Sequence, residues 1–338
     1  MKTSNQKKGS NYKFLKIFLG VALTTLALWL SFRKLDWEGL KETFFQINFF
    51  WVILAAANSL FTVYALGWRW QILLNPKVKV PLTSLFRLNI ISQFVNIVMP
   101  GRFGELARAY LASKQYKVSG AYVVGTIAIE KILDFFIFVF LWISVPVLFA
   151  MQKEVKGYKI ALFLCFFMAL FLILFIWQPK LFLKWTNLIS RFLPAKFRQV
   201  FQDFFKKGIE AFRLLKNAKT LTILIIFTFI FVGGQVLTNY ILFIAFDMKL
   251  SFWAGLVVLL ALQVVNIPPS IPGKIGIYEY SVILALSIFS ISKSQALSYG
   301  LMLHMVAYVP KILLGLIFLP SVDISLRKSS KLQVEKLG

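Results

Sequence analysis

Apolar residues gather along this chain in stretches of about 20, the length that an α-helix needs to cross a bilayer core of about 30 Å. These stretches predict membrane-spanning helices over residues 14–32, 49–68, 121–149, 158–177, 220–246 and 295–320. Two further apolar stretches, 82–112 and 252–290, are each broken in the middle by Pro-Gly. The pattern therefore predicts an all-α polytopic membrane protein with about six full crossings and two broken-helix segments.

The two broken stretches contain the same motif. Residues 93–105 read QFVNIVMPGRFGE, and residues 263–279 read QVVNIPPSIPGKIGIYE. Both begin with Gln-x-Val-Asn-Ile and continue through Pro-Gly, a basic residue and Gly to a Glu, with short insertions in the second copy. Such a match is improbable by chance. It indicates an internal duplication, which often underlies transporter folds.

The charge balance of +25 could indicate a nucleic-acid partner. In a chain that is 59% hydrophobic, basic loops facing the cytoplasm and its anionic lipids explain the excess better, and no nucleic acid is expected. Residues 1–16 hold five lysines and no acidic residue, so the basic N-terminus, 1–13, is predicted to be cytoplasmic. The first apolar stretch is followed by no small-x-small cleavage site, which favours an uncleaved helix.

The remaining basic segments predict how the broken stretches are inserted. Segment 178–219 holds ten lysines and arginines against two acidic residues, and it is expected to form amphipathic helices on the inner leaflet. Segment 69–81, which includes Arg69, and the tail, 321–338, are also expected to be cytoplasmic. All of these basic segments lie on the cytoplasmic side if 82–112 is a re-entrant hairpin that enters from the cytoplasm and 252–290 is one that enters from outside. The transmembrane region, 14–320, would then contain an inverted-topology repeat.

The hairpin tips are predicted to bind an anion. In each copy a helix is expected to begin just after Pro-Gly, within the membrane, where its unpaired N–H groups and positive dipole end favour negative charge. The basic residue of each copy adds a full positive charge, so two such tips could hold a phosphate near the midplane. The candidate tip residues are Gly101, Arg102 and Glu105 in the first copy and Gly273, Lys274 and Glu279 in the second.

A structural interpretation of the same residues remains open. Pro-Gly could simply form a turn, Arg102 could pair with Glu105, and the motif glutamates could complement the helix N-termini. The polar residues before the break could line a cavity or satisfy the interrupted backbone, and these are Gln93, Asn96, Gln263 and Asn266.

Charged residues within the apolar stretches form a second set of candidates. Such residues usually face the protein interior because charge is costly in lipid. On the predicted helix 121–149, Glu130 and Asp134 share a face, Lys131 could pair with Asp134, and Arg108 could partner one of the acids. On the last helix, His304 and Lys311 lie on one face, and His304 could carry a coupling proton or make an interhelical hydrogen bond.

The segments PGRFGELARAYL, IPGKIGIYE and AIEKILD resemble the lysylphosphatidylglycerol synthase transmembrane family, also called flippase-like integral membrane proteins. The resemblance covers residues 10–320. It is to the transmembrane part of the family, without the soluble synthase domain. It implies translocation of an aminoacylated phospholipid or, as in archaeal relatives, of a lipid-linked sugar. It also implies functional roles for Arg102, Glu105, Lys274 and Glu279. The family pattern leads us to expect Gly where this chain has Lys274, so the second tip is more positive here.

These observations favour a multi-pass transporter of an anionic, phosphate-containing lipid in the cytoplasmic membrane, with both termini cytoplasmic. No ATP-binding G-x-x-x-x-G-K-[ST] motif occurs, and neither a cofactor nor a metal is expected. One alternative is a membrane-embedded transferase that uses Glu130 with Asp134, or His304, in acid–base chemistry. Another is a non-catalytic subunit that works with a separate lipid synthase or transferase.

Overall fold

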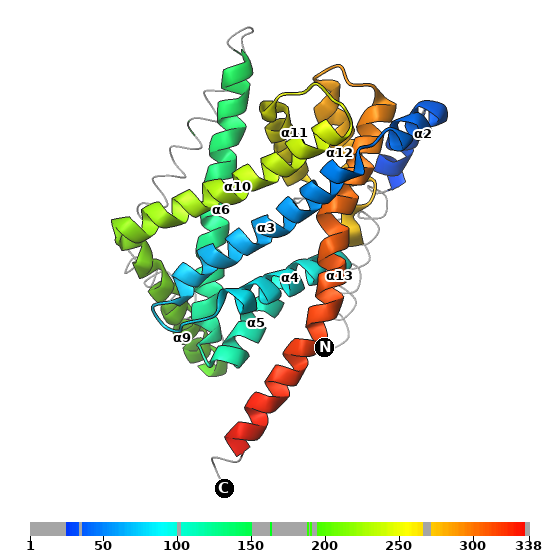
Figure 1. Ribbon diagram of the computed structural model, residues 1–338. Coiled ribbons are helices and arrows are strands. Elements are labelled where there is room, and N and C mark those ends of the chain that lie inside the picture. Colours follow the sequence, from blue (N-terminus) through cyan, green and yellow to red (C-terminus); the bar gives the residue numbers. More distant parts are fainter. Residues whose placement is uncertain are drawn as a thin grey trace, which may run out of the picture. The chain divides into compact units, whose positions relative to one another are not determined.

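A computed structural model describes residues 25–33, 36–99, 103–150, 195–265 and 272–334, and the single positions 163, 188 and 190. No strand occurs in these ranges, which confirms the all-α prediction for this part of the chain. Figure 1 shows the helices, which are α2 Trp37–Phe45, α3 Phe49–Leu74, α4 Leu82–Val98, α5 Gly104–Tyr116, α6 Gly120–Ala150, α9 Ala195–Phe212, α10 Ala218–Ala245, α11 Phe252–Val264, α12 Ile277–Ser287 and α13 Lys293–Val334, with 3-10 turns η1 Arg213–Lys216 and η2 Pro272–Lys274.

Three helices within the described ranges are long and apolar enough to cross a membrane: Phe49–Leu74, Ala218–Ala245 and the Lys293–Pro320 part of α13. They confirm three of the predicted spanning stretches. The predicted stretch 121–149 is covered by one helix, α6. Stretch 158–177 and most of 14–32 lie outside the described residues, apart from one helical position, 163, and helical residues 25–32. The chain is therefore a multi-pass membrane protein.

The helices on either side of the predicted breaks are short. Helices α4, α11 and α12 are apolar and have 17, 13 and 11 residues. At 1.5 Å per residue they are about 26, 20 and 17 Å long, less than a bilayer core of about 30 Å. Helix α4 ends at Val98, just before the first Pro-Gly, and α11 ends at Val264, inside the second motif copy and before its Pro-Gly.

The chain folds into two compact units. Unit 1 comprises residues 1–62, 92–104 and 233–316. Asparagine side chains tie its helices together: Asn58 on α3 donates to the Gly234 carbonyl oxygen on α10 at 2.7 Å, and Asn239 on α10 donates to the Gly255 carbonyl oxygen on α11 at 2.8 Å. Such bonds stabilise helix pairs where lipid supplies no hydrophobic driving force. Helix α12 packs against α11 in the same unit.

Unit 2 comprises residues 63–91, 105–232 and 317–338. Helices α6 and α9 lie side by side in it (Figure 1). They approach closely at two glycines, because a Cβ atom on Gly125 would lie 2.4 Å from the Gly208 carbonyl oxygen. The prediction of a helix within the basic segment 178–219 is confirmed by α9. One face of this region packs into the protein, since Ala211, Phe212 and Leu215 belong to the buried core of the unit.

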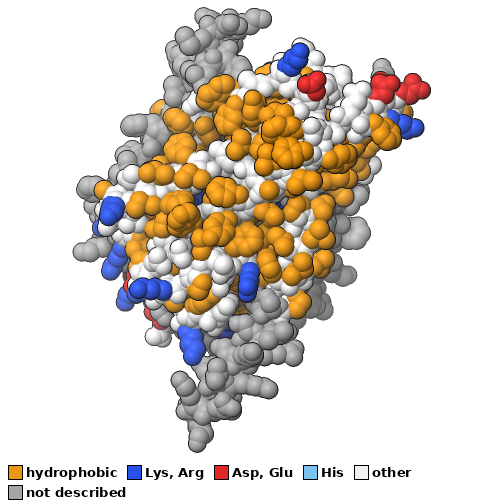
Figure 2. Space-filling view, viewed as in Figure 1, with side chains coloured by type: hydrophobic (Ala, Val, Ile, Leu, Met, Phe, Trp, Pro, Cys, Tyr) orange, Lys and Arg blue, Asp and Glu red, His pale blue; other side chains and the backbone are white. Residues whose placement is uncertain are grey.

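The surface between the charged patches is apolar. Figure 2 shows hydrophobic side chains covering much of the visible face. Large apolar residues on the outside of α3 include Phe50, which is 68% exposed, and Ile53, which is 69% exposed. Apolar surface of this extent on several helices matches a protein that is surrounded by lipid.

Candidate functional site

The first Pro-Gly motif ends α4 and begins α5. The Gly104 N–H, at the start of α5, donates to Asn96 Oδ1 on α4 at 2.8 Å. Of the two roles considered for Asn96, satisfying the interrupted backbone is therefore the one observed. Gly101, Arg102 and Pro100 lie outside the described residues. Gln93 is half-buried on α4.

Gly104 lies so close to α4 that no side chain fits. A Cβ atom there would be 1.9 Å from the Ser92 carbonyl oxygen and 2.7 Å from the Asn96 amide. Gly104→Ala should therefore push α5 away from α4 and lower the free energy of unfolding by at least about 2 kcal/mol, at the upper end of overpacking costs. Urea unfolding in detergent would measure it. Gly233→Ala is the matched control, because a Cβ atom on Gly233 meets nothing within 4 Å and helical alanine is favoured. Equal stability of both variants would contradict the close contact.

Helix α5 carries two charged residues of unit 2 in its first two turns. Glu105 occupies the first turn, as expected for an acid at a helix N-terminus, and its Oε1 lies 3.1 Å from Lys131 Nζ on α6. Arg108 follows one turn later and is buried. Its guanidinium donates to Glu130 Oε2 at 2.5 Å and to Asn89 Oδ1, and it lies 4.2 Å from the centre of the Trp70 ring. The prediction that Arg108 partners an acid of α6 is confirmed.

Arg69 lies at the other end of the same cluster. It belongs to α3, which continues to Leu74, and is fully buried, so its placement in a segment that follows the spanning helix was wrong. The apolar pattern continues through Leu73 and Leu74, and this continuation was the missed signal that Arg69 lies inside a helix. Its guanidinium donates to both carboxylate oxygens of Asp134, at 2.6 and 3.3 Å, and to Thr228 Oγ1 at 2.9 Å.

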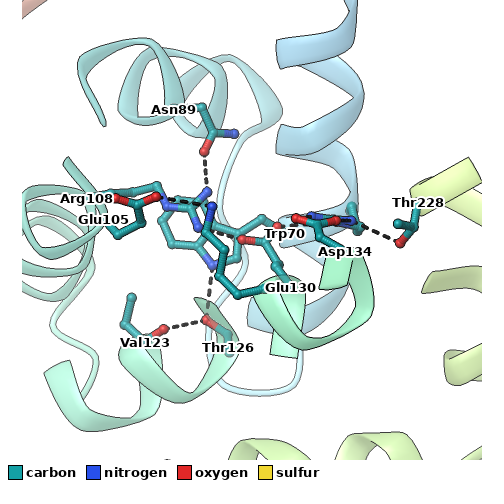
Figure 3. A network of polar contacts seen from close by, with 11 residues as sticks. Trp70, Asn89, Glu105, Arg108, Val123, Thr126, Glu130, Asp134 and Thr228 are labelled. Carbon is teal, nitrogen blue, oxygen red and sulfur yellow. Dashed lines mark hydrogen bonds and ion pairs between the residues drawn. The ribbon is translucent and has the colours of Figure 1, made fainter. Parts of the chain in front are cut away.

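Together these residues form one charge network, shown in Figure 3. We use this name for Arg69, Glu105, Arg108, Glu130, Lys131 and Asp134. The three positive and three negative side chains balance, as buried charges must. Lys131 contacts Glu105 rather than Asp134, so the predicted pairing of Lys131 within α6 was wrong. Exposure falls along the network from 59% for the Lys131 side chain to 0% for Arg69, so the network is open at one end.

The buried end of the network has more hydrogen-bond donors than acceptors. Nε of Arg69, Nε of Arg108 and Nδ2 of Asn89 are buried and make no hydrogen bond to any part of the chain that the structure describes. Arg69 Nε lies 3.5 Å from Glu130 Oε1, which is an ion-pair contact, and that oxygen accepts no hydrogen bond either. An unsatisfied buried donor costs about 1–3 kcal/mol. The site is thus chemically suited to an anion that supplies several acceptor oxygens.

The second motif forms a strained turn followed by α12. Gly273 and Lys274 in η2 have φ angles of 74° and 55°, and Gly276 has φ of 84°. The left-handed backbone is easy for glycine but unfavourable for lysine. The Gly276 N–H donates to Glu279 Oε2 at 2.6 Å, so Glu279 caps the N-terminus of α12 as predicted. Lys274 is half-buried.

Glu279 also contacts the single histidine of the chain. Its Oε1 and His304 Nδ1 on α13 share a hydrogen bond of 2.6 Å. The predicted interhelical hydrogen bond of His304 is therefore confirmed. Tyr278 stacks on the imidazole with ring centres 4.3 Å apart, and Tyr308 meets it edge-on, also at 4.3 Å. Neither tyrosine was among the residues that sequence analysis singled out.

The two motif copies share a contact that reaches beyond the motif. In each, the glutamate in the first turn of the helix after the break pairs with a basic side chain on the next long helix. In the first copy Glu105 pairs with Lys131, 26 residues further along the chain. In the second copy Glu279 pairs with His304, 25 residues further along. This correspondence supports a duplication that includes the following helix.

The other predicted candidates lie near these groups in the chain. Gln263 is half-buried at the end of α11, and Asn266 lies outside the described residues. Lys311 is half-buried on α13, two turns after His304. No group of three or more potential metal ligands occurs within the described ranges.

Comparison with known proteins places the chain among membrane proteins. Residues 17–315 match the family model of the lysylphosphatidylglycerol synthase TM region. A UPF0104 membrane protein of Methanocaldococcus jannaschii is 29% identical over 246 residues, 70% of this chain and 98% of the relative. One from Pyrococcus horikoshii is 24% identical over 331 residues, 91% of this chain and 96% of the relative. No solved structure matches the chain.

Proposed function

Because the chain belongs to the lysylphosphatidylglycerol synthase TM region family, we propose that it transports an anionic, phosphate-containing lipid across the cytoplasmic membrane. The substrate class is an aminoacyl-phospholipid or a polyprenyl-phosphate-linked sugar. Both combine a long apolar part with at least one phosphate. The family and the multi-pass helical fold support a lipid-related membrane function. The transport step and its substrate are our proposal.

The observation that carries the proposal is the excess of buried donors in the charge network. Arg108 Nε and Asn89 Nδ2 lack an acceptor among the described residues, and Arg69 Nε has only the long contact of 3.5 Å to Glu130 Oε1. A phosphate offers several acceptor oxygens and a negative charge, and a guanidinium binds it through two parallel hydrogen bonds. An apolar core would be at least as stable as a partly satisfied ionic one. The retention of these groups therefore favours a binding role.

The exposure gradient supports a path for the headgroup. A phosphate meets Lys131 first, because this side chain is the most exposed member of the charge network. It competes there with Glu105, and one helical turn further along α5 it meets Arg108. At Lys131 and again at Arg108, the phosphate takes the place of the carboxylate that pairs with the positive side chain. The headgroup therefore never loses all of its charge partners on the way into the protein.

The proposal includes the membrane topology inferred from the sequence. It places about six full crossings around two re-entrant hairpins that enter from opposite faces, with both termini in the cytoplasm. The short helices on either side of each break and the matching glutamate–cation contacts support this inverted repeat. In this arrangement the tips with Arg102 and Lys274 hold the phosphate near the midplane, each helped by a helix N-terminus.

Purified protein in liposomes tests the function directly. Fluorescent lipids of matched tails and different headgroups would be followed by a quencher that reaches only the outer leaflet. We expect accelerated movement of anionic phosphate lipids without any partner or cosubstrate, and little effect on an uncharged lipid. Chemical conversion of the lipid would support the transferase alternative. Neither movement nor conversion would support the subunit alternative.

Lys131 offers a test with little effect on folding. It is half-exposed in its pair with Glu105, and such pairs contribute about 0–1 kcal/mol to stability. Lys131→Ala should leave the thermal midpoint nearly unchanged while lowering transport of the anionic lipid about tenfold, since one charge-assisted contact to phosphate is lost. Lys77→Ala is the control, because Lys77 forms a similarly exposed pair with Glu210 at 2.7 Å. Equal transport by both variants would remove Lys131 from the path.

A further inference from the structure

The Glu279–His304 pair lies where a charge change would affect the second tip. Glu279 uses one carboxylate oxygen for the Gly276 N–H and the other for His304 Nδ1, both at 2.6 Å. Gly276 directly follows the turn that carries Lys274. Any change in the charge of Glu279 or His304 therefore acts on the N-terminus of α12 and on the lysine before it.

The surroundings leave few other groups that could take up charge. Glu279 is buried and His304 nearly so. Among the described residues, Tyr278 from α12 and Tyr308 from α13 contact the imidazole. Tyr299 of α13 lies near Tyr278, and Lys311 follows two turns after His304 on α13. Helix α11, which packs against α12, holds no titratable residue. Of the described groups in this part of unit 1, the imidazole–carboxylate pair is the one that combines a histidine with a directly hydrogen-bonded acid.

The pair has two charge states that differ by one proton. With a proton on Nδ1 donated to the carboxylate, the imidazole is neutral and the pair carries one negative charge. A second proton on Nε2 gives an imidazolium beside a carboxylate, and the pair becomes neutral. The hydrogen bond between Nδ1 and Oε1 is present in both states, so the proton can come and go without breaking the contact between α12 and α13.

We propose that the Glu279–His304 pair is the binding site of a proton that is transported together with the lipid. This inference rests on the proposed transport function. When the pair is negative, it repels an anionic headgroup from the tip that contains Lys274. When the pair is neutral, the repulsion is gone, and proton and phosphate occupy the protein together. On the other side of the membrane the phosphate leaves, Nε2 releases its proton, and the pair regains its negative charge.

Binding of the proton and binding of the anion are thermodynamically linked. If protonation raises the affinity for the anion by some factor, the anion raises the affinity for the proton by the same factor. Couplings between sites are commonly about 5- to 150-fold. A proton gradient in the direction of lipid movement should then accelerate transport several-fold, and an opposed gradient should slow it.

The first experiment measures the proton without transport. The chain has one histidine, so ¹⁵N-histidine labelling of the full-length protein gives the signals of a single imidazole. We expect Nε2 to gain a proton as the pH is lowered, and to do so at a higher pH when the detergent micelles contain phosphatidylglycerol than when they contain only phosphatidylcholine. Glu279→Gln should remove this difference. A ring whose protonation does not change over the pH range in which the protein stays folded, or changes identically in both lipids, would overturn the proposal.

The second experiment measures coupling in proteoliposomes with an imposed pH difference. Wild-type transport of labelled phosphatidylglycerol should respond to the gradient, whereas His304→Gln should transport at a rate that is independent of it. Glu210→Gln, in the exposed pair with Lys77, is the control and should respond like the wild type. A gradient response that survives in His304→Gln would disprove the coupling. If the wild type moves no lipid at all, the proposed function fails, and the titration of the ring decides whether the proton site exists.

Discussion

Replacing Arg69 by methionine should lower the free energy of unfolding by about 3–5 kcal/mol, the cost of leaving buried charge without its partner. The guanidinium is fully buried and bonds Asp134 and Thr228 while contacting Glu130. Without it, Asp134 loses its ion-pair partner, and Glu130 keeps only its contact with Arg108. Unfolding by denaturant in detergent, followed by tryptophan fluorescence, would measure the loss.

A compensated variant separates charge from packing. Arg69→Met combined with Asp134→Leu removes one charge of each sign and keeps apolar volume, so it should recover most of the lost stability. Lys77→Ala is the control for loss of a positive charge in a half-exposed pair and should cost less than about 1 kcal/mol. If Arg69→Met were as stable as the control, the ion pairs of Arg69 would contribute nothing and the charge network would need another explanation.

Changing both tip residues, Arg102→Ala with Lys274→Ala, should nearly abolish transport of an anionic lipid. One charge-assisted contact to a phosphate contributes about 1.5–3 kcal/mol, so each single change should lower transport about ten- to a hundredfold. The losses of the two single variants should add in the double variant, because Arg102 and Lys274 contact the phosphate independently. Arg102→Lys should recover part of the activity, since lysine keeps the charge but not the two parallel hydrogen bonds. Initial rates in proteoliposomes, normalised to folded protein, provide the measurement.

Exchanging the charges of the first tip tests the structural alternative. Arg102→Glu with Glu105→Arg should preserve a simple ion pair, yet it moves the positive charge away from the tip, so transport should fall. Glu105 also contacts Lys131, so the exchange is made together with Lys131→Glu to restore that pair. Its transport is compared with that of Lys131→Glu alone, because Lys131 is itself proposed to contact the phosphate. Full transport by the stably folded Arg102→Ala, Lys274→Ala variant would disprove the hypothesis that the two tips hold the phosphate.

The sequence predicted the local features of this protein better than its long-range contacts. Pro-Gly marks the two breaks because proline lacks an N–H and glycine accepts left-handed backbone, and the structure has its helix interruptions at these motifs. Glu105 and Glu279 were expected at helix N-termini because a carboxylate complements the dipole there. These inferences need only neighbouring residues, so a single sequence contains the required information.

The partners of the buried charges depend on how helices are rotated against each other. Spacing along α6 suggested a bond between Lys131 and Asp134, but Lys131 meets Glu105 on α5 and Asp134 meets Arg69 on α3. A positive residue at the end of an apolar run fits a loop as well as a helix, so Arg69 was assigned to the wrong element. The aromatic surroundings of His304 were likewise missed, because Tyr278 and Tyr308 look like ordinary apolar-helix residues in the sequence.

The separation of Arg69 from Asp134 has a consequence for biosynthesis. The two residues are 65 positions apart, so at a synthesis rate of about 5–20 residues per second α3 enters the membrane about 3–13 s before its carboxylate partner exists. During that interval the unpaired arginine costs at most about 2.5–3.5 kcal/mol, the insertion-scale value for a helix centre, and the apolar remainder of α3 must offset this cost. Membrane insertion of α3 is therefore less favourable until α6 has been synthesised and Asp134 can pair with Arg69. Variants that lose Asp134 but keep Arg69 should therefore accumulate to a lower level in the membrane than the variant that loses both residues.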